Sequence, residues 1–339
     1  RAAAGASETA AEAAAAEAED VARTVVGLLA GARPHPLTAD ADLRPEGRRG
    51  PMSRSLDSYR EYYGRWARTW ERQALLRARP CAGDEDLARA FTDLIDPLRW
   101  PREGLEPQAL REIRRLKARM ESERLPRGAD PALHLKLGPG GLSDVEWVAQ
   151  ILQLSHAGTH PGLRTTSTIG ALQAAVRAGL LSADDGGVLA STWILASRLR
   201  SAIVLGTGRA SGPRSQVLPV QVREIRLVGR LIGLGSGKER ELEDLYRRSA
   251  RHTRAVAERI VFTDGTAHGS PPSAPTPSTS TSVSQDQSAE PAPGRSTGSA
   301  RNAYGQSRRG TAASGSRSPR RAGRNRATRR RPEGPYPWS

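Results

Sequence analysis

The sequence predicts a mainly α-helical protein with one short strand near its N-terminus and a disordered C-terminal tail. Apolar residues recur at helical spacing in most segments between residues 7 and 262. Strict alternation of apolar and polar residues, typical of a strand, covers residues 37–44. Beyond residue 264 the chain is built largely from Ser, Pro, Gly, Thr and Arg. Such a segment cannot bury enough apolar surface to offset the entropy lost on folding.

The first predicted helix covers residues 7–31. Ser7 is a suitable N-cap, Val21 and Val25 belong to one apolar stripe, and Gly31 ends the helix. A Pro-His-Pro linker at residues 34–36 then leads into the predicted strand.

A long helix is predicted over residues 55–78, with most of the aromatic surface of the chain on one face. Its aromatic residues are Tyr59, Tyr62, Tyr63, Trp66 and Trp70. They could form a platform on which bases stack, but their helical period favours packing into a core.

Helices dominate the remainder of the chain. A short extended segment is expected at residues 133–137, and Ser167 and Ser182 are predicted N-caps. The predicted helices cover residues 85–95, 108–124, 143–157, 168–178, 183–205, 219–234 and 238–262.

The charge of the chain lies mostly in the tail. The formal net charge is +16, and residues 266–339 hold twelve arginines against three acidic residues, a balance of +9 that leaves +7 for the rest. The predicted folded part is therefore only mildly basic. Apart from weak, salt-dependent contacts of the tail, we expect no binding of nucleic acid.

Cysteine use and hydropathy favour a cytoplasmic protein. Cys81 is the single cysteine, so no intrachain disulfide can form, which agrees with a reducing compartment. No run of about 18 apolar residues and no signal peptide are apparent, and we therefore expect no contact with a membrane.

The first candidate site is the polar face of the predicted strand, formed by Asp40, Asp42 and Arg44. Two carboxylates at positions i and i+2 point the same way and could hold Mg²⁺, while an arginine beside them could contact a polyphosphate. A solvated strand face without function is the alternative, and the short motif alone favours that alternative.

The second candidate site is the glycine-rich segment 134–146. Lys136 precedes a turn that leads into a helix N-terminus, an arrangement that can bind an anion. The alternative is a tight turn followed by a capping box of Ser143 and Glu146, with Asp144 and Glu146 favourable to the helix dipole. From the residues alone the tight turn is preferred. The six histidines show no spacing typical of a metal site.

Three long motifs, in this order, resemble one family. Residues 40–51 read DADLRPEGRRGP, residues 70–79 read WERQALLRAR, and residues 134–147 read HLKLGPGGLSDVEW. Together they resemble the bacterial glutamine synthetase adenylyltransferases, and the high content of Ala, Arg and Gly resembles the actinobacterial members. The resemblance extends from about Val21 to Phe262 and corresponds to the C-terminal, adenylyltransferase half of those bifunctional enzymes.

The resemblance implies a domain organisation. Residues 1–80 would be the last part of a nucleotidyltransferase domain of the DNA polymerase β type, an α/β fold. Residues 85–264 would form a helical bundle domain, and residues 265–339 a disordered tail.

The resemblance also implies an activity, the Mg²⁺-dependent transfer of AMP from ATP to a tyrosine of glutamine synthetase, which regulates nitrogen assimilation. Asp40 would be the catalytic carboxylate and a metal ligand, with Asp42 beside it. Arg44, Lys136, Asp144 and Glu146 would contribute to ATP binding. Glutamine synthetase and a PII-type signal protein would be the partners.

One departure from the family pattern concerns the other metal ligands. The family takes two further carboxylates from an upstream GSxxDxD segment, and no such segment precedes Asp40 in this sequence. We therefore expect this polypeptide by itself to have no adenylyltransferase activity. The alternative function is a helical binding module for glutamine synthetase or the signal protein.

Overall fold

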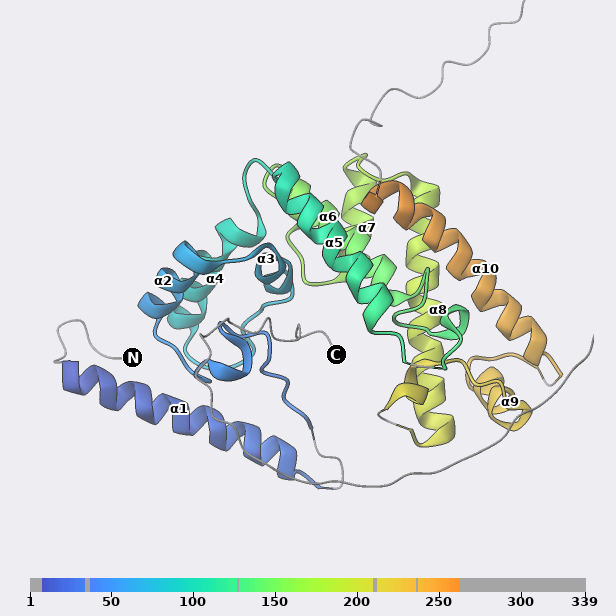
Figure 1. Ribbon diagram of the computed structural model, residues 1–339, viewed down its shortest axis with the longest axis horizontal. Helices are drawn as coiled ribbons and strands as arrows, with labels where there is room; N and C mark the ends of the chain where they lie inside the picture. The colour runs from blue at the N-terminus through green and yellow to red at the C-terminus, as the bar shows by residue number, and fades with distance from the viewer. Residues whose placement is uncertain (1–7, 34–36, 127, 210–211, 236, 263–339) are drawn as a thin grey trace, which may run out of the picture. The chain divides into compact units, whose positions relative to one another are not determined.

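The computed structural model describes residues 8–33, 37–126, 128–209, 212–235 and 237–262. These residues form α-helices joined by turns and short 3₁₀ segments, so the prediction of a mainly α-helical protein is confirmed (Figure 1). The helices are α1 (Glu8–Gly31), α2 (Leu56–Trp66), α3 (Thr69–Leu75), α4 (Glu85–Arg99), α5 (Pro107–Glu123), α6 (Leu142–His156), α7 (Thr168–Arg177), α8 (Ala183–Thr207), α9 (Val222–Leu231) and α10 (Glu239–Ala257).

Helix α6 lies at the centre of the largest hydrophobic core. Twelve of its fifteen residues are buried, so α6 is covered nearly all around and does not have the single apolar face of a surface helix. Helices α5, α7, α8 and α10 supply the neighbouring apolar side chains, including Ile113, Leu172 and Leu189. The turn into α6 is thereby held on a rigid support.

A second core joins α8, α9 and α10. Leu199 and Ile203 of α8 pack with Val228 of α9 and Tyr246 of α10, all fully buried or nearly so. Among the described helices, α8 is the one long and apolar enough to cross a membrane. Its buried residues are shared between this core and the first one, as expected for a central helix of a helical bundle.

A third, smaller core contains the aromatic residues of α2. Tyr63 packs against Leu75 of α3 and Ile95 of α4, with Tyr59 and Tyr62 at its edge. The core-packing interpretation is therefore correct for the tyrosines. It is wrong for Trp66, whose side chain is 62% exposed.

The predicted single helix over residues 55–78 is divided into α2 and α3. The chain leaves the helical conformation at Ala67, and the backbone N–H of Arg68 donates to the carboxylate of Glu71 at 2.8 Å. Glu71 also accepts a hydrogen bond from the hydroxyl of Tyr62 at 2.8 Å. A buried carboxylate thus begins a new helix where periodicity alone predicts continuation.

The strand predicted at residues 37–44 is wrong, because the described residues contain no named strand. This segment is irregular and then turns, with the N–H of Arg44 bonded to the carbonyl of Ala41 and that of Gly47 to Arg44. An alternating segment becomes a strand only when a partner supplies ladder hydrogen bonds, and among the described residues none lies beside it. The structure consequently does not confirm a nucleotidyltransferase remnant.

The extended segment predicted at residues 133–137 is present in a minimal form. His134 and Val217 form an isolated antiparallel bridge, flanked by hydrogen bonds from Leu135 N–H to Gln216 and from Leu218 N–H to Leu133. The predicted disordered tail, residues 265–339, lies outside the described residues. The division into domains near residues 80–85 stays a prediction.

Candidate functional site

The turn that precedes α6 is closed by its own hydrogen bonds. The N–H groups of Leu142 and Ser143 donate to the carbonyls of Leu135 and Lys136, both at 2.9 Å. The N–H of Gly140 donates to the Asp144 carboxylate at 2.7 Å. Because these groups already have partners, the helix N-terminus offers no open anion site, and the tight-turn alternative describes the segment.

The capping box predicted for Ser143 and Glu146 is wrong. Helix α6 begins after Gly141, which has no side chain to cap it, and Ser143 is already inside the first turn. The carboxylate that contacts the turn belongs to Asp144, two residues before the predicted Glu146.

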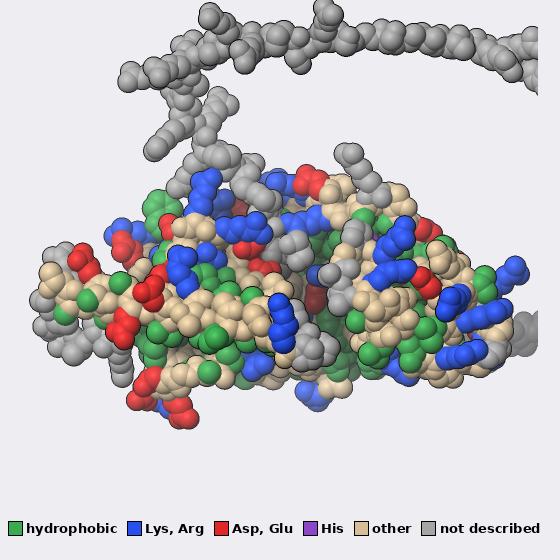
Figure 2. Space-filling model, turned by 90° about the horizontal axis from the view of Figure 1, so that it is seen from below, with side chains coloured by type: hydrophobic (Ala, Val, Ile, Leu, Met, Phe, Trp, Pro, Cys, Tyr) green, Lys and Arg blue, Asp and Glu red, His purple; other side chains and the backbone are tan. Residues whose placement is uncertain are grey.

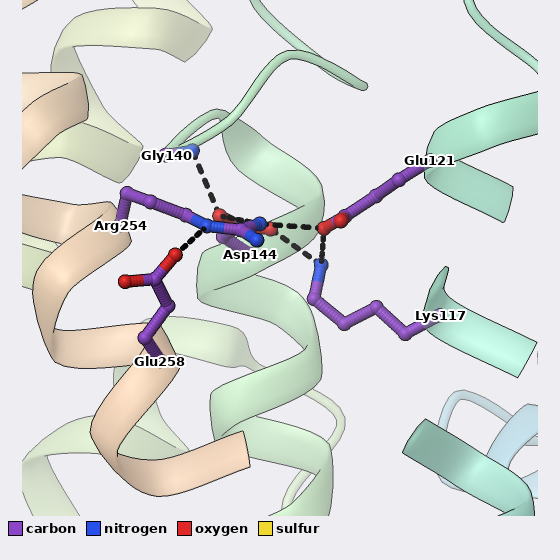
Figure 3. Close-up of polar contacts among 6 residues, drawn as sticks. All are labelled: Lys117, Glu121, Gly140, Asp144, Arg254 and Glu258. Atoms are coloured by element: carbon purple, nitrogen blue, oxygen red, sulfur yellow. Dashed lines mark hydrogen bonds and ion pairs between the residues drawn. The ribbon is translucent and has the colours of Figure 1, made fainter. Parts of the chain in front are cut away.

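Asp144 belongs to a buried charge network that joins three helices (Figure 3). Its carboxylate pairs with Lys117 of α5, whose side chain is fully buried, and lies 3.4 Å from the Arg254 guanidinium of α10. Glu121 bridges the same two cations at 2.8 and 2.7 Å. Burial alone would raise the pKa of Glu121, but the hydrogen bonds from Arg254 and Lys117 hold it below its usual value.

A cleft of about 210 Å³ opens on the other side of α6. Three predicted site residues line it, and they come from segments about 100 residues apart: Asp40, Lys136 and Glu146. Its remaining lining residues are Leu43, Gln73, Met120, Leu137, Ser143, Trp147 and Gln150. The cleft thus combines a charged part with apolar walls.

The other predicted site residues are engaged elsewhere. Asp42 binds the guanidinium of Arg48 at 2.8 Å, and Arg44 donates to the carbonyls of Ala41 and Gly50 at 2.6 and 3.1 Å. Neither side chain lines the cleft, and Asp144 lies in the charge network. Their assignment to metal and ATP binding stays a prediction.

Glu146 is the cleft residue whose ionisation is most altered. Burial raises the pKa of its carboxyl group, although the nearby cations Arg77, Lys136 and Arg200 act in the opposite direction. A guanidinium nitrogen of Arg77 lies 3.3 Å from the carboxylate. The carboxyl group therefore accepts a proton more readily than one in water.

Two cleft residues carry polar groups to which sequence reasoning assigns no role. Gln73 of α3 and Gln150 of α6 are buried, and the amide nitrogen of Gln73 donates to the amide oxygen of Gln150 at 2.6 Å. Gln73 is part of the WERQALLRAR motif, and its place in that motif was the sequence feature that could have indicated a role. Nothing in the local pattern around Gln150 distinguishes it from a surface glutamine.

The described residues fit part of a Mg²⁺ site. Asp40 is exposed at the cleft, and its Oδ1 accepts the N–H of Asp42 at 2.9 Å, which leaves Oδ2 for a ligand. No group of three metal-ligating side chains occurs in the part of the chain that the structure describes. Mg²⁺ bound with substrate phosphates commonly uses one or two carboxylates, and Asp40 could supply one of them.

Two family models match the chain, each over one part of it. Residues 12–94 match the glutamate-ammonia ligase adenylyltransferase family, and residues 111–261 match the GlnD PII-uridylyltransferase family. The first range contains Asp40 and Gln73, and the second contains Lys136 and Glu146. Both ranges therefore contribute to the cleft.

Curated relatives named bifunctional glutamine synthetase adenylyltransferase/adenylyl-removing enzyme are similar over most of the described chain. The relative from Streptomyces coelicolor is 57% identical over 227 residues, which are 67% of this chain and 22% of that protein. The relative from Cutibacterium acnes is 53% identical over 226 residues, 67% of this chain and 23% of its own length. The relative from Mycobacterium avium is 48% identical over 225 residues, 66% of this chain and 22% of its own length.

The chain thus spans between a fifth and a quarter of the length of these relatives. The resemblance inferred from the three motifs is confirmed. Over two thirds of its length, this chain is a close relative of one part of the actinobacterial bifunctional glutamine synthetase adenylyltransferases/adenylyl-removing enzymes.

Proposed function

We propose that this chain contributes one wall of an active site that transfers AMP from ATP to a tyrosine of glutamine synthetase. The observation that carries the proposal is the cleft, which brings Asp40 together with Lys136 and Glu146. The two family matches meet there, and the curated relatives bear the name of this activity.

In this proposal the cleft residues bind and orient the nucleotide. The ammonium group of Lys136 neutralises part of the charge of the triphosphate. Asp40 supplies a carboxylate oxygen to Mg²⁺, which when bound would neutralise phosphate charge and align the α-phosphate. The tyrosine oxygen attacks the α-phosphorus, the bond to the β-phosphate oxygen breaks, pyrophosphate leaves, and the phenolic proton passes to a base.

Glu146 has a different role in this proposal. Its contact with Arg77, at 3.3 Å, suits a group that holds this guanidinium in place. Arg77 also donates to the Thr166 carbonyl at 2.6 Å and the Thr168 hydroxyl at 2.7 Å, which ties the turn after α3 to the start of α7. Glu146 therefore positions a wall of the cleft.

The test measures transfer of label from α-³²P-ATP to purified glutamine synthetase with Mg²⁺. The assay contains the chain either alone or with a polypeptide that carries the GSxxDxD segment expected for the family. We expect labelling only in the supplemented reaction. Labelling by the chain alone would show that the described carboxylates suffice, and no labelling in either reaction would refute the proposal.

Variants then locate the active site. Asp40→Asn should reduce labelling by about 100-fold or more, because a metal ligand stabilises the charge of the transition state. Lys136→Met should raise the KM for ATP by about tenfold. Asp57→Asn is the matched control, since Asp57 lies on the exposed surface of α2 and should leave the rate unchanged. An Asp40→Asn variant as active as the control would exclude the cleft as the active site.

The alternative, a binding module, gives a different result. The match of residues 111–261 to the GlnD PII-uridylyltransferase family favours a role of the helical part in partner recognition. A module of that kind would bind glutamine synthetase or a PII-type protein without ATP. Its affinity would not respond to Asp40→Asn or Lys136→Met.

A further inference from the structure

The buried amide pair in the cleft wall has unused hydrogen-bonding capacity. Gln73 is 1% exposed and Gln150 is 7% exposed. Within the described residues, the Oε1 atom of Gln73 is buried and has no hydrogen-bond partner, and Gln73 lines the cleft. The bond between the two side chains uses the amide oxygen of Gln150, and the amide nitrogen of Gln150 donates to none of the described residues.

The pair therefore leaves one acceptor and one donor without a protein partner in the described part of the chain. This holds for either orientation of the two amides. If both amides are flipped, Gln150 becomes the donor to Gln73, and one acceptor oxygen and one donor nitrogen again stay without such a partner. A buried polar oxygen without a partner destabilises the folded state. Such a cost at a cleft wall indicates a ligand that completes the hydrogen bonds.

The surroundings of the pair suit a flat heterocycle. Leu43, Met120, Leu137 and Trp147 give the cleft apolar walls, and its charged lining residues are Asp40, Lys136 and Glu146. A ligand with an aromatic base and an anionic group matches this division. An adjacent donor and acceptor on protein amides is also the pattern that reads an amino group beside a ring nitrogen in adenine.

We propose that Gln73 and Gln150 determine the base specificity of the cleft by binding the edge of adenine. This inference rests on the proposed function, which makes ATP the substrate. The amide oxygen of Gln73 accepts a hydrogen bond from the 6-amino group, and the amide nitrogen of Gln150 donates to the neighbouring ring nitrogen. A purine without the 6-amino group leaves the buried oxygen unpaired and binds more weakly.

The test compares adenosine with purine riboside, which lacks only the 6-amino group, by calorimetric titration of the full chain. We expect the chain to bind adenosine about tenfold more tightly than purine riboside. Gln73→Met should abolish this preference, because it removes the acceptor oxygen. Gln108→Met is the control, because Gln108 is an exposed glutamine on α5 and should leave the preference intact.

A purely structural role for the pair predicts a different pattern. Gln73→Met would then weaken both nucleosides equally, and their ratio would stay unchanged. If Gln73→Met does not fold by circular dichroism, Gln150→Met decides the question in the same way. Equal binding of the two nucleosides by the unmodified chain, or no binding of adenosine at millimolar concentration, would overturn the inference.

The two proposals can fail separately. A chain that prefers adenosine but transfers no AMP in the supplemented assay keeps the base-reading pair and loses the proposed activity. A chain that transfers AMP without any preference between the two nucleosides keeps the activity and loses the role of Gln73 and Gln150.

Discussion

Lys117 and Asp144 show what a buried charge requires from its neighbours. Both side chains are removed from solvent, and each meets an opposite charge within the network of α5, α6 and α10 (Figure 3). The Lys117 ammonium also lies 5.6 Å from the centre of the Trp147 ring. Removing Lys117 leaves two buried or half-buried carboxylates, Asp144 and Glu121, with Arg254 as their one remaining cation in the network.

Lys117→Met should therefore lower the free energy of unfolding by about 3–5 kcal/mol. Urea denaturation monitored by circular dichroism measures the change. Arg60→Met is the matched control, because Arg60 pairs with Asp57 on an exposed face of α2 and its loss should barely alter stability. Equal midpoints for the two variants would mean that the network contributes nothing.

Gly140 occupies a position that excludes any side chain. Its φ is +75°, and a Cβ atom there would lie 1.8 Å from the carbonyl oxygen of Ala250 in α10. Gly140→Ala should thus separate the turn from α10 and lower the melting temperature by several degrees or more. Gly187 in α8 has nothing within 4 Å of the same position, so Gly187→Ala should stabilise by about 0.5–1 kcal/mol. A melting temperature for Gly140→Ala at or above that of the parent would contradict this account.

Residue types and their order predicted part of the cleft. Asp40, Lys136 and Glu146 stand in recognisable motifs, and the structure brings them to one cleft. The sequence could not separate Glu146 from Asp144, because acidic residues at a helix start look alike until their surroundings are known. Asp144 faces α5 and α10, whereas Glu146 faces Arg77 in the turn after α3. Gln73 and Gln150 gain importance only through their contact across 77 positions.

At the scale of elements, helices with strong local signals were predicted well. Ser167 and Ser182 accept the N–H of Gly170 and Asp185, and α7 and α8 begin directly after these caps. Local side-chain chemistry determines such boundaries. The strand at residues 37–44 and the single helix at residues 55–78 failed because a neighbouring partner strand and a buried carboxylate decide those conformations.

The junction of α2 and α3 provides a test through the ionisation of Tyr62. Burial and the hydrogen bond to Glu71 raise the pKa of Tyr62 to about 12. Glu71→Ala should bring this pKa down toward the ordinary value of 10.0, because the second cause is removed. Absorbance of tyrosinate near 295 nm as a function of pH gives the measurement.

The raised pKa of Tyr62 also sets a direction for stability. A tyrosine that holds its proton more tightly in the folded state contributes stability that is complete below pH 10 and is lost as the pH rises toward 12. The parent should lose stability over this window more steeply than Glu71→Ala. Identical alkaline profiles would show that Glu71 does not act on Tyr62. Tyr62→Phe, which lacks the titrating hydroxyl, serves as the control.

At the scale of the whole molecule, burial is distributed unevenly between α1 and α6. Val21, Val25 and Leu28 of α1 are 58%, 49% and 70% exposed, and the face in Figure 2 shows exposed apolar side chains among charged ones. Two contacts tie α1 to later segments. The Glu19 carboxylate accepts the N–H groups of Met52 and Ser53 at 2.6 and 3.0 Å, and the Leu29 carbonyl accepts the N–H of Leu37 at 3.0 Å.

Amide hydrogen exchange should reflect this difference. We expect the amides of α1 to exchange within seconds to minutes and those of α6 to stay protected for much longer, because few buried contacts oppose local opening of α1. Glu19→Gln should accelerate exchange in α1 further and leave α6 unchanged. Protection of α1 equal to that of α6 would show that α1 is covered in solution.

The position of Arg254 has a consequence for the order in which the protein folds. Lys117 and Asp144 lie 27 residues apart and can meet early, whereas Arg254 follows Asp144 by 110 residues. Contacts of such long separation form late, and on the ribosome this contact cannot form before α10 has emerged. Chains released before Arg254 should accordingly be more sensitive to protease than chains released after Phe262, which a series of stalled lengths would reveal. Until α10 emerges, the nascent chain holds a half-neutralised charge cluster beside α6, so the arrival of α10 becomes the step that fixes the cleft-bearing helix in place.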